Sequence, residues 1–227
     1  MSENFHDIVA YEFDRKYKEK KDFLERYEVL EEIICKHGSN EFIALDVGCG
    51  SGVFLKILSE KSKKVYGIDG SGKMLEIATQ KLRKYRIQNV SLFNCDLFEI
   101  DKYIKRVDLI LCSSVLEYIE DFDGALNYLG NLLNFNGILI ITLPNKYSFY
   151  RKLLKLTYRL IKKPIYYGVI KNIYSFDVIY NTLKEKNLKI LEGKYFAPTF
   201  ILSSIFRPLG LNKYSDNMFV VVAKKRK

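Results

Sequence analysis

The sequence has few of the residues that build metal sites and disulfide frameworks, and no long apolar run. Its four cysteines are widely spaced, forming neither a CxxC pair nor a cluster with the two histidines. We therefore expect no zinc site and no disulfide framework, but reduced thiols in a cytoplasmic protein. No stretch reaches the roughly 18 apolar residues of a transmembrane helix, and the charged start lacks the apolar segment of a signal peptide, so neither is expected.

Flexible linkers are also not expected, because the chain contains only four prolines and 13 glycines. The 227 residues are 48% hydrophobic, which is enough to build a sizeable core. This length suits one α/β domain with a small attachment.

Positive charge is concentrated in two places. The net charge is +10, but residues 146–163 carry seven Lys and Arg without any acid, and residues 224–227 carry four more. The remainder of the chain is close to neutral, so the basic character is local and does not by itself indicate a nucleic-acid-binding protein.

Strand-like and helix-like segments alternate along the chain, and continuous apolar strands separated by helices indicate a parallel sheet covered on both faces. The expected strands are 42–47, 64–69, 90–95, 107–112, 137–143, 188–193 and 218–223. The expected helices are 53–61, 71–86, 98–105, 120–134 and 175–186, preceded by one or two helices within 6–37.

A glycine-rich turn follows the first strand, in the stretch ALDVGCGSGVF (44–54). A strand, a tight glycine turn and a helix start together let a ligand approach the backbone. The spacing differs from the dinucleotide pattern G-x-G-x-x-G, and no G-K-[ST] follows as in a P-loop. A purely structural turn stays open as an alternative at this point.

Acidic residues at the ends of the next two strands favour a ligand site. Asp69 ends the second strand, where a carboxylate can accept hydrogen bonds from a ribose diol, and Asp96 follows the third. Ligands of open α/β sheets bind beyond the carboxyl ends of the strands. Three successive strand ends therefore supply a glycine turn and two polar acceptors.

The successive segments LDVGCGSG, VYGIDGS, NCDLF, VDLILCSSVLEYI and LLNFNGILIITLPN resemble, in order, the motifs of class I S-adenosylmethionine-dependent methyltransferases. The resemblance runs from about residue 43 to 145 and continues into YSFDVIYNTLKEKNLKI. It implies a doubly wound, Rossmann-like α/β fold with a seven-stranded, mainly parallel sheet whose last strand is antiparallel. It also implies a single domain with N-terminal helices (1–40), a cofactor-binding core (41–145), an inserted cap (146–175) and the C-terminal part of the sheet (176–227).

The same resemblance implies the site residues. The first motif would place four residues against the methionine part of S-adenosylmethionine: Asp46, Gly48, Cys49 and Gly50. Asp69 would bind the ribose hydroxyls and Met74 would pack near the adenine. Asp96 would accept from the adenine amino group, with Leu97 offering its backbone amide, and Ser113 would lie below the sulfonium. S-adenosylhomocysteine is then the product.

Two positions depart from the family pattern. Gly70 follows the ribose aspartate where the family usually has an apolar residue, which suggests looser packing of the adenine. Tyr118 stands where relatives acting on phenols and small molecules often have the histidine of VLEH.

No catalytic residue stands out. Of the two histidines, His37 is expected as a helix C-terminal cap, and His6 lies in an N-terminal helix that can fold over the site in the family. Further weak candidates for a general base are Tyr118, Glu117, Tyr11 and Tyr17. Cys112 is expected in the core.

The segment 146–163 predicts an amphipathic helix with an apolar stripe opposite a basic face. Such a helix fits a lid that buries its apolar side on the domain, a peripheral contact with an anionic membrane, or an anionic or nucleic-acid partner. The apolar stretch 195–211 is expected to be irregular and suits an acceptor pocket or a lid contact.

Methyl transfer to a small-molecule or lipid-linked acceptor is the leading hypothesis, at oxygen first and nitrogen second, by in-line displacement. The motifs that hold a base for amino or cytosine methylation are absent, so nucleic acid is less favoured. A non-catalytic module that keeps the cofactor site and recruits a membrane or anionic partner, and an RNA methyltransferase, remain as alternatives.

Overall fold

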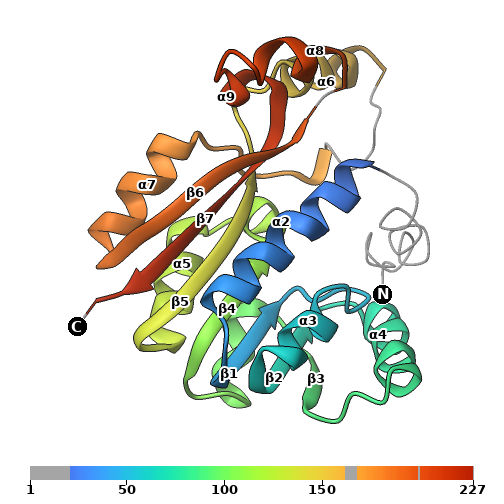
Figure 1. Ribbon diagram of the computed structural model, residues 1–227, viewed down its shortest axis with the longest axis vertical. Helices are drawn as coiled ribbons and strands as arrows, with labels where there is room; N and C mark the ends of the chain where they lie inside the picture. The colour runs from blue at the N-terminus through green and yellow to red at the C-terminus, as the bar shows by residue number, and fades with distance from the viewer. Residues whose placement is uncertain (1–20, 162–167, 199, 227) are drawn as a thin grey trace.

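The computed structural model describes residues 21–161, 168–198 and 200–226. They form a seven-stranded sheet in the order β3-β2-β1-β4-β5-β7-β6, with the first five strands parallel and β7 antiparallel to both neighbours (Figure 1). The strands are β1 Ser39–Val47, β2 Ser62–Asp69, β3 Val90–Asn94, β4 Val107–Ser113, β5 Leu133–Pro144, β6 Leu188–Pro198 and β7 Asp216–Lys225. The predicted doubly wound sheet with an antiparallel last strand is confirmed.

Helices follow most strands. They are α2 Lys21–His37, α3 Leu55–Glu60, α4 Gly72–Lys84, α5 Phe122–Leu132, α6 Phe149–Ile161, α7 Phe176–Glu185, α8 Phe200–Phe206 and α9 Asn212–Ser215, with 3-10 turns η1 Leu97–Lys102 and η2 Leu116–Tyr118. Capping side chains begin two of the longer helices: Ser71 accepts from the amide of Met74 in α4, and Asp121 from that of Gly124 in α5.

One expectation about the C-terminal part was wrong. The strand expected at 188–193 continues to Pro198, and the stretch expected to be irregular contains the end of β6 and the helix α8. The reason is tertiary, because β6 pairs with β7 along its whole length, from Leu188 opposite Lys225 to Pro198 opposite Asp216. Pairing with a distant strand extends β6 beyond what its local sequence indicates.

The core lies on both faces of the sheet. Alternate side chains of β4 enter different clusters: Leu109 and Leu111 pack with α2, α3 and α4, whereas Ile110 and Cys112 pack with η1, α5 and α7. Cys112 is fully buried, as expected. The two layers leave the carboxyl ends of the parallel strands as the edge where a ligand can bind.

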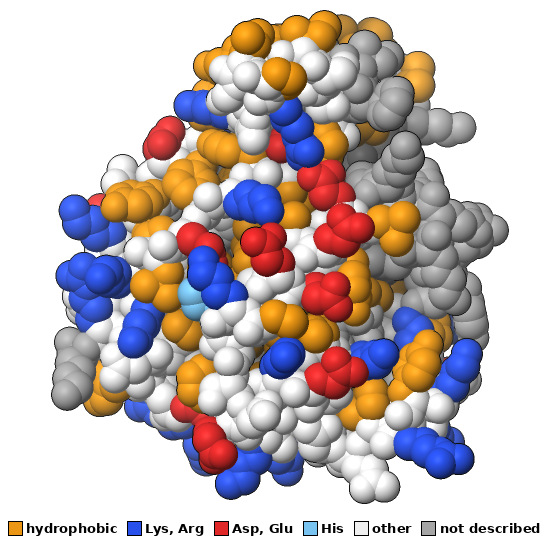
Figure 2. Space-filling view, in the orientation of Figure 1, with side chains coloured by type: hydrophobic (Ala, Val, Ile, Leu, Met, Phe, Trp, Pro, Cys, Tyr) orange, Lys and Arg blue, Asp and Glu red, His pale blue; other side chains and the backbone are white. Residues whose placement is uncertain are grey.

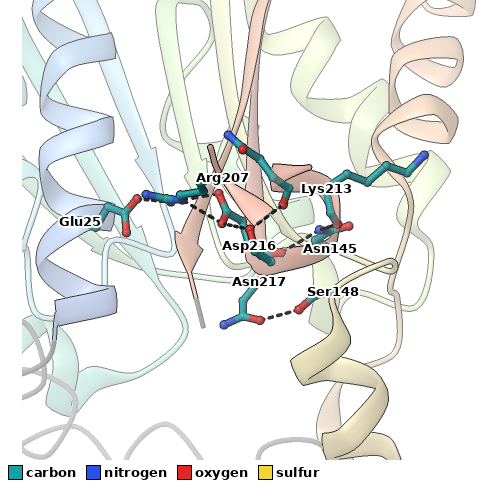
Figure 3. A network of polar contacts seen from close by, with 9 residues as sticks. Glu25, Asn145, Ser148, Arg207, Lys213, Asp216 and Asn217 are labelled. Atoms are coloured by element: carbon teal, nitrogen blue, oxygen red, sulfur yellow. Dashed lines mark hydrogen bonds and ion pairs between the residues drawn. The ribbon is translucent and has the colours of Figure 1, made fainter. Parts of the chain in front are cut away.

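Helices α6, α8 and α9 gather at one end of the molecule, at the top of Figure 1. We call these three helices, together with residues 207–211 that join α8 to α9, the end lobe. A polar network anchors the end lobe (Figure 3): Arg207 donates to both carboxylate oxygens of the fully buried Asp216, at 3.1 and 3.0 Å, and to Glu25 of α2 at 2.6 Å. Asn145 donates to the carbonyls of Lys213 and Asp216 at 2.8 and 2.7 Å. The network links the end lobe to the sheet and to α2.

Candidate active site

The residues predicted to form the site converge at one edge of the sheet. Val47 of β1 pairs with Ile68 of β2 on one side and with Cys112 of β4 on the other. Since these strands are parallel and in register, the segments that follow them begin side by side. Asp69 at the end of β2 and Ser113 at the end of β4 thus flank the glycine turn that follows β1.

The three glycines of the turn adopt backbone angles that favour glycine. The φ angles of Gly48, Gly50 and Gly52 are +66°, +52° and +77°, in the left-handed region that other residues rarely adopt. A Cβ on Gly48 would lie 2.3 Å from Cγ2 of Val115, and a Cβ on Gly52 would lie 3.1 Å from the Cβ of Ala78. The glycines let this turn pack closely against the loop after β4 and against α4.

Asp69 holds the glycine turn and the start of α4 together. Its Oδ2 accepts from the amide of Gly50 and its Oδ1 from the amide of Ser71, both at 2.8 Å. A carboxylate is also the group that accepts from a ribose diol in this position of open α/β sheets. Beside it, a Cβ on Gly70 would meet nothing within 4 Å, which leaves open space next to the carboxylate.

Asp46 is a buried carboxylate with an unmet hydrogen bond. The residue is 2% exposed, and its Oδ2 has no hydrogen-bond partner among the residues described. Burial, and then the charge of Asp69, raise the pKa of Asp46 well above its ordinary value. A bound cation would satisfy the orphaned oxygen and relieve this repulsion. The ammonium group of S-adenosylmethionine therefore fits the site.

The residues expected on the adenine side lie at η1 and in α4. Asp96 begins η1, where its Oδ1 accepts from the amide of Phe98 at 3.1 Å. Leu97 is buried, as is Met74, which packs with Ile77 in a small cluster apart from the two main ones. Cys49 is buried in the glycine turn, and its amide extends the β1–β2 pairing by donating to the carbonyl of Ile68 at 2.8 Å.

Sequence reasoning missed part of the polar cluster beyond Ser113. Arg26, which is 8% exposed, reaches this edge from α2 and donates to Ser114 Oγ and, at 3.3 Å, to Thr142 Oγ1. Thr142 also accepts from the amide of Ser114 at 3.1 Å, and its hydroxyl is 3.2 Å from that of Ser113. The one signal of this cluster in the sequence was the threonine within the apolar run ILIITL. Nothing in the residues around Arg26 or Ser114 indicates that the two side chains meet, or that Ser114 adopts a positive φ angle.

The candidates for a general base lie in different parts of the chain. Tyr118 ends η2, close to this cluster in the chain. His37 lies elsewhere, since its Nε2 is 2.5 Å from Glu192 Oε1 on β6 and so links α2 to the far end of the sheet. His6, Tyr11 and Tyr17 fall outside the described residues. Within the described ranges, no group of three or more potential metal ligands occurs.

Comparisons with known proteins agree with this geometry. Residues 39–194, more than half of the chain, match the family of the methyltransferase domain. The chain belongs to that family. The resemblance to class I S-adenosylmethionine-dependent methyltransferases is thereby confirmed, and S-adenosylmethionine is the cofactor of that superfamily.

Individual relatives are distant. This methyltransferase-family chain is 31% identical over 103 residues to ubiquinone biosynthesis O-methyltransferase of Pelagibacter ubique, covering 45% of this chain and 42% of that protein. It is 25% identical over 232 residues to an uncharacterised methyltransferase of Alkaliphilus oremlandii, covering 98% and 93%. The chain spans about half the length of several curated relatives that it matches.

A solved structure shows the same fold. The magnesium protoporphyrin IX methyltransferase of Synechocystis with bound S-adenosylhomocysteine superposes with a TM-score of 0.71 and 17% identity, covering 97% of each chain. At this identity the likeness concerns the fold alone.

Proposed function

We propose that this chain transfers a methyl group from S-adenosylmethionine to an oxygen of a small-molecule or lipid-linked acceptor. The observation that carries the cofactor assignment is the orphaned, buried carboxylate of Asp46 beside the glycine turn. In this proposal Asp46 receives the methionine ammonium and the turn of Gly48, Cys49 and Gly50 contacts the methionine backbone.

The remaining predicted residues have matching roles. Asp69 accepts from the ribose diol, and the open space beside Gly70 and the side chain of Met74 receive the adenine. Asp96 keeps its Oδ2 free of partners among the residues described, so it can accept from the adenine amino group, with the amide of Leu97 beside it. Ser113 lies at the sulfonium side. When bound, the cofactor supplies an electrophilic methyl group, and the protein aligns the acceptor for in-line displacement.

An oxygen acceptor is supported by the relative in Pelagibacter ubique, whose name describes an O-methyltransferase of ubiquinone biosynthesis. The resemblance is partial, so the acceptor itself stays a proposal.

Calorimetric titration with S-adenosylhomocysteine tests the cofactor site. We expect Asp69→Asn to weaken binding by roughly tenfold or more, because the NH2 group that replaces one carboxylate oxygen donates and cannot accept from a backbone amide or from the ribose. The matched control is Asp177→Asn on α7, whose side chain is 70% exposed. Wild-type protein that fails to bind, or an Asp69→Asn variant that binds as wild type does, would refute the assignment.

A second proposal concerns the end lobe, which we infer to contact an anionic membrane. Of α6, only Leu154 is buried. The end lobe instead exposes large apolar side chains, and orange surface is seen at the top of Figure 2. The exposed apolar residues are Leu153, Leu156, Leu160, Ile161, Ile205 and Leu209. A lid that buries this apolar face on the domain is therefore less well supported than an external contact.

Charge on the end lobe supports an anionic surface as its partner. Residues 146–163 and 199–215 contain no acidic residue, and Lys152, Lys155 and Arg159 are exposed among the apolar side chains of α6. Each basic residue near an anionic leaflet contributes about 1 kcal/mol, and each leucine that enters the interface adds about 1.5–3 kcal/mol. Within the described residues no helix is both long and apolar enough to cross a bilayer, so the proposed contact is peripheral.

A further inference from the structure

A buried cluster of charged side chains lies beside the loop that packs on the glycine turn of the proposed cofactor site. It contains Arg26 of α2 and Glu117 of η2, which are 8% and 3% exposed. Ser114 lies with both, because its hydroxyl accepts from Arg26, and Ser114 and the charge of Arg26 both lower the pKa of Glu117. The adjacent residue, Val115, touches the glycine turn at Gly48. The cluster therefore adjoins the turn that contacts the methionine part of the cofactor.

Two polar atoms of this cluster have no hydrogen-bond partner among the residues described. They are Nε of Arg26, a donor, and Oε2 of Glu117, an acceptor. Buried polar groups in folded proteins are nearly always satisfied, and leaving charged ones unpaired is costly. A single group that can both donate and accept a hydrogen bond would satisfy this donor and this acceptor.

A hydroxyl group meets both requirements. It donates its hydrogen to Glu117 Oε2 and accepts from Arg26 Nε with one lone pair, and its oxygen keeps a second lone pair for attack on a methyl group. A neutral amine has a single lone pair, which Arg26 would occupy. A protonated amine has none. The cluster thus favours oxygen over nitrogen as the acceptor atom.

We propose that Arg26 and Glu117 bind the hydroxyl of the acceptor, and that Glu117 takes its proton during methyl transfer. This inference rests on the proposed function. As the carbon–oxygen bond forms, the carbon–sulfur bond breaks and its electron pair stays on sulfur, while the hydroxyl proton moves to Glu117 Oε2. Arg26 stabilises the negative charge that develops on the oxygen.

The surroundings of Glu117 agree with a role as base. Burial raises the pKa of Glu117, whereas Arg26, Ser114 and Arg151 lower it, and Cys112 also faces it. A carboxylate whose pKa lies above its ordinary value is a better proton acceptor near neutral pH. The acceptor-dependent rate should therefore rise with pH through the pKa of Glu117, and this rise should be absent in Glu117→Gln.

The test compares nitrophenol with nitroanisole, in which a methyl group replaces the hydroxyl hydrogen. Both are titrated, at a pH where nitrophenol is protonated, into the full chain saturated with S-adenosylhomocysteine. We expect nitrophenol to bind roughly tenfold to a hundredfold more tightly, as a hydrogen bond to a buried charge implies. Glu117→Gln should abolish most of this preference. The control Glu120→Gln, three residues away and 82% exposed in its side chain, should keep it.

Three outcomes would overturn the inference: equal binding of the two probes to wild type, a preference retained in Glu117→Gln, or nitroaniline binding as tightly as nitrophenol. Equal binding of the two probes is also what a cluster satisfied by a buried water would give. The affinity for S-adenosylhomocysteine, measured on the same samples, separates the two proposals. If the cofactor product binds and the preference is absent, only the role of Arg26 and Glu117 fails. Retained S-adenosylhomocysteine binding in Glu117→Gln also shows that the variant is folded.

Discussion

Replacing Gly48 by alanine should destabilise the protein through two separable effects. At φ +66° the backbone favours glycine, and an alanine in this region costs about 1–2 kcal/mol. The new Cβ would also stand 2.3 Å from Val115 Cγ2, and relieving such overpacking typically costs about 1–3 kcal/mol. We therefore expect Gly48→Ala to lower the free energy of unfolding by about 2–5 kcal/mol.

A double-mutant cycle in urea separates the effects. Val115→Ala removes Cγ2 and leaves the Cβ of residue 115 at 3.6 Å from the added methyl, an ordinary contact. In that background Gly48→Ala should cost only the backbone term, so the coupling energy should be about 1–3 kcal/mol. Gly130→Ala is a control in which the opposite sign is expected. Gly130 lies in α5, and an added Cβ would meet nothing within 4 Å. This variant should raise the free energy of unfolding by about 0.5–1 kcal/mol. An unchanged unfolding free energy for Gly48→Ala, or the same penalty in both backgrounds, would refute this reading of the turn.

Two further predictions concern charge. Because the pKa of Asp46 is raised on folding, the native state keeps a proton that the unfolded chain releases, so this group lowers stability as pH rises above its ordinary pKa. Asp46→Asn should remove that loss, so it should raise the free energy of unfolding at neutral pH while it weakens the binding of S-adenosylhomocysteine. Urea titrations at acidic and neutral pH measure the first effect, and calorimetry measures the second. A variant that is less stable than wild type at neutral pH would contradict the expected sign. For the end lobe, we expect the protein to sediment with phosphatidylglycerol vesicles but not with phosphatidylcholine vesicles. This binding should be lost at high salt and in the double variant Leu156→Ser/Leu160→Ser. It should be kept in Val178→Ser, which changes an exposed apolar position on α7. Absence of vesicle binding, or salt-sensitive binding to RNA alone, would remove the membrane contact.

The cofactor side could be predicted because its residues lie where short segments end. A strand that ends in Asp69, or in the turn from Gly48 to Gly52, can be recognised from its local sequence. The carboxyl ends of parallel strands meet at one edge of the sheet, so these residues are expected to lie together. The alternation of apolar segments likewise predicted the order and type of the elements. The extent of β6 and the helices α8 and α9 were missed, and the segment expected as a helix at 98–105 is the 3-10 turn η1. Pairing with β7 determines how far β6 extends.

The acceptor side was decided by tertiary structure. Glu117 was one weak candidate among several, and nothing near Arg26 in the sequence marks it as a partner of Ser114, which is 88 residues away. Their unmet hydrogen bonds arise because folding removes both side chains from water. The sequence by itself thus determined the family, the sheet and the place where the cofactor is expected, since these depend on local patterns. The folded chain decided which charges are buried together and which apolar side chains of α6 stay exposed, because burial depends on contacts between distant segments.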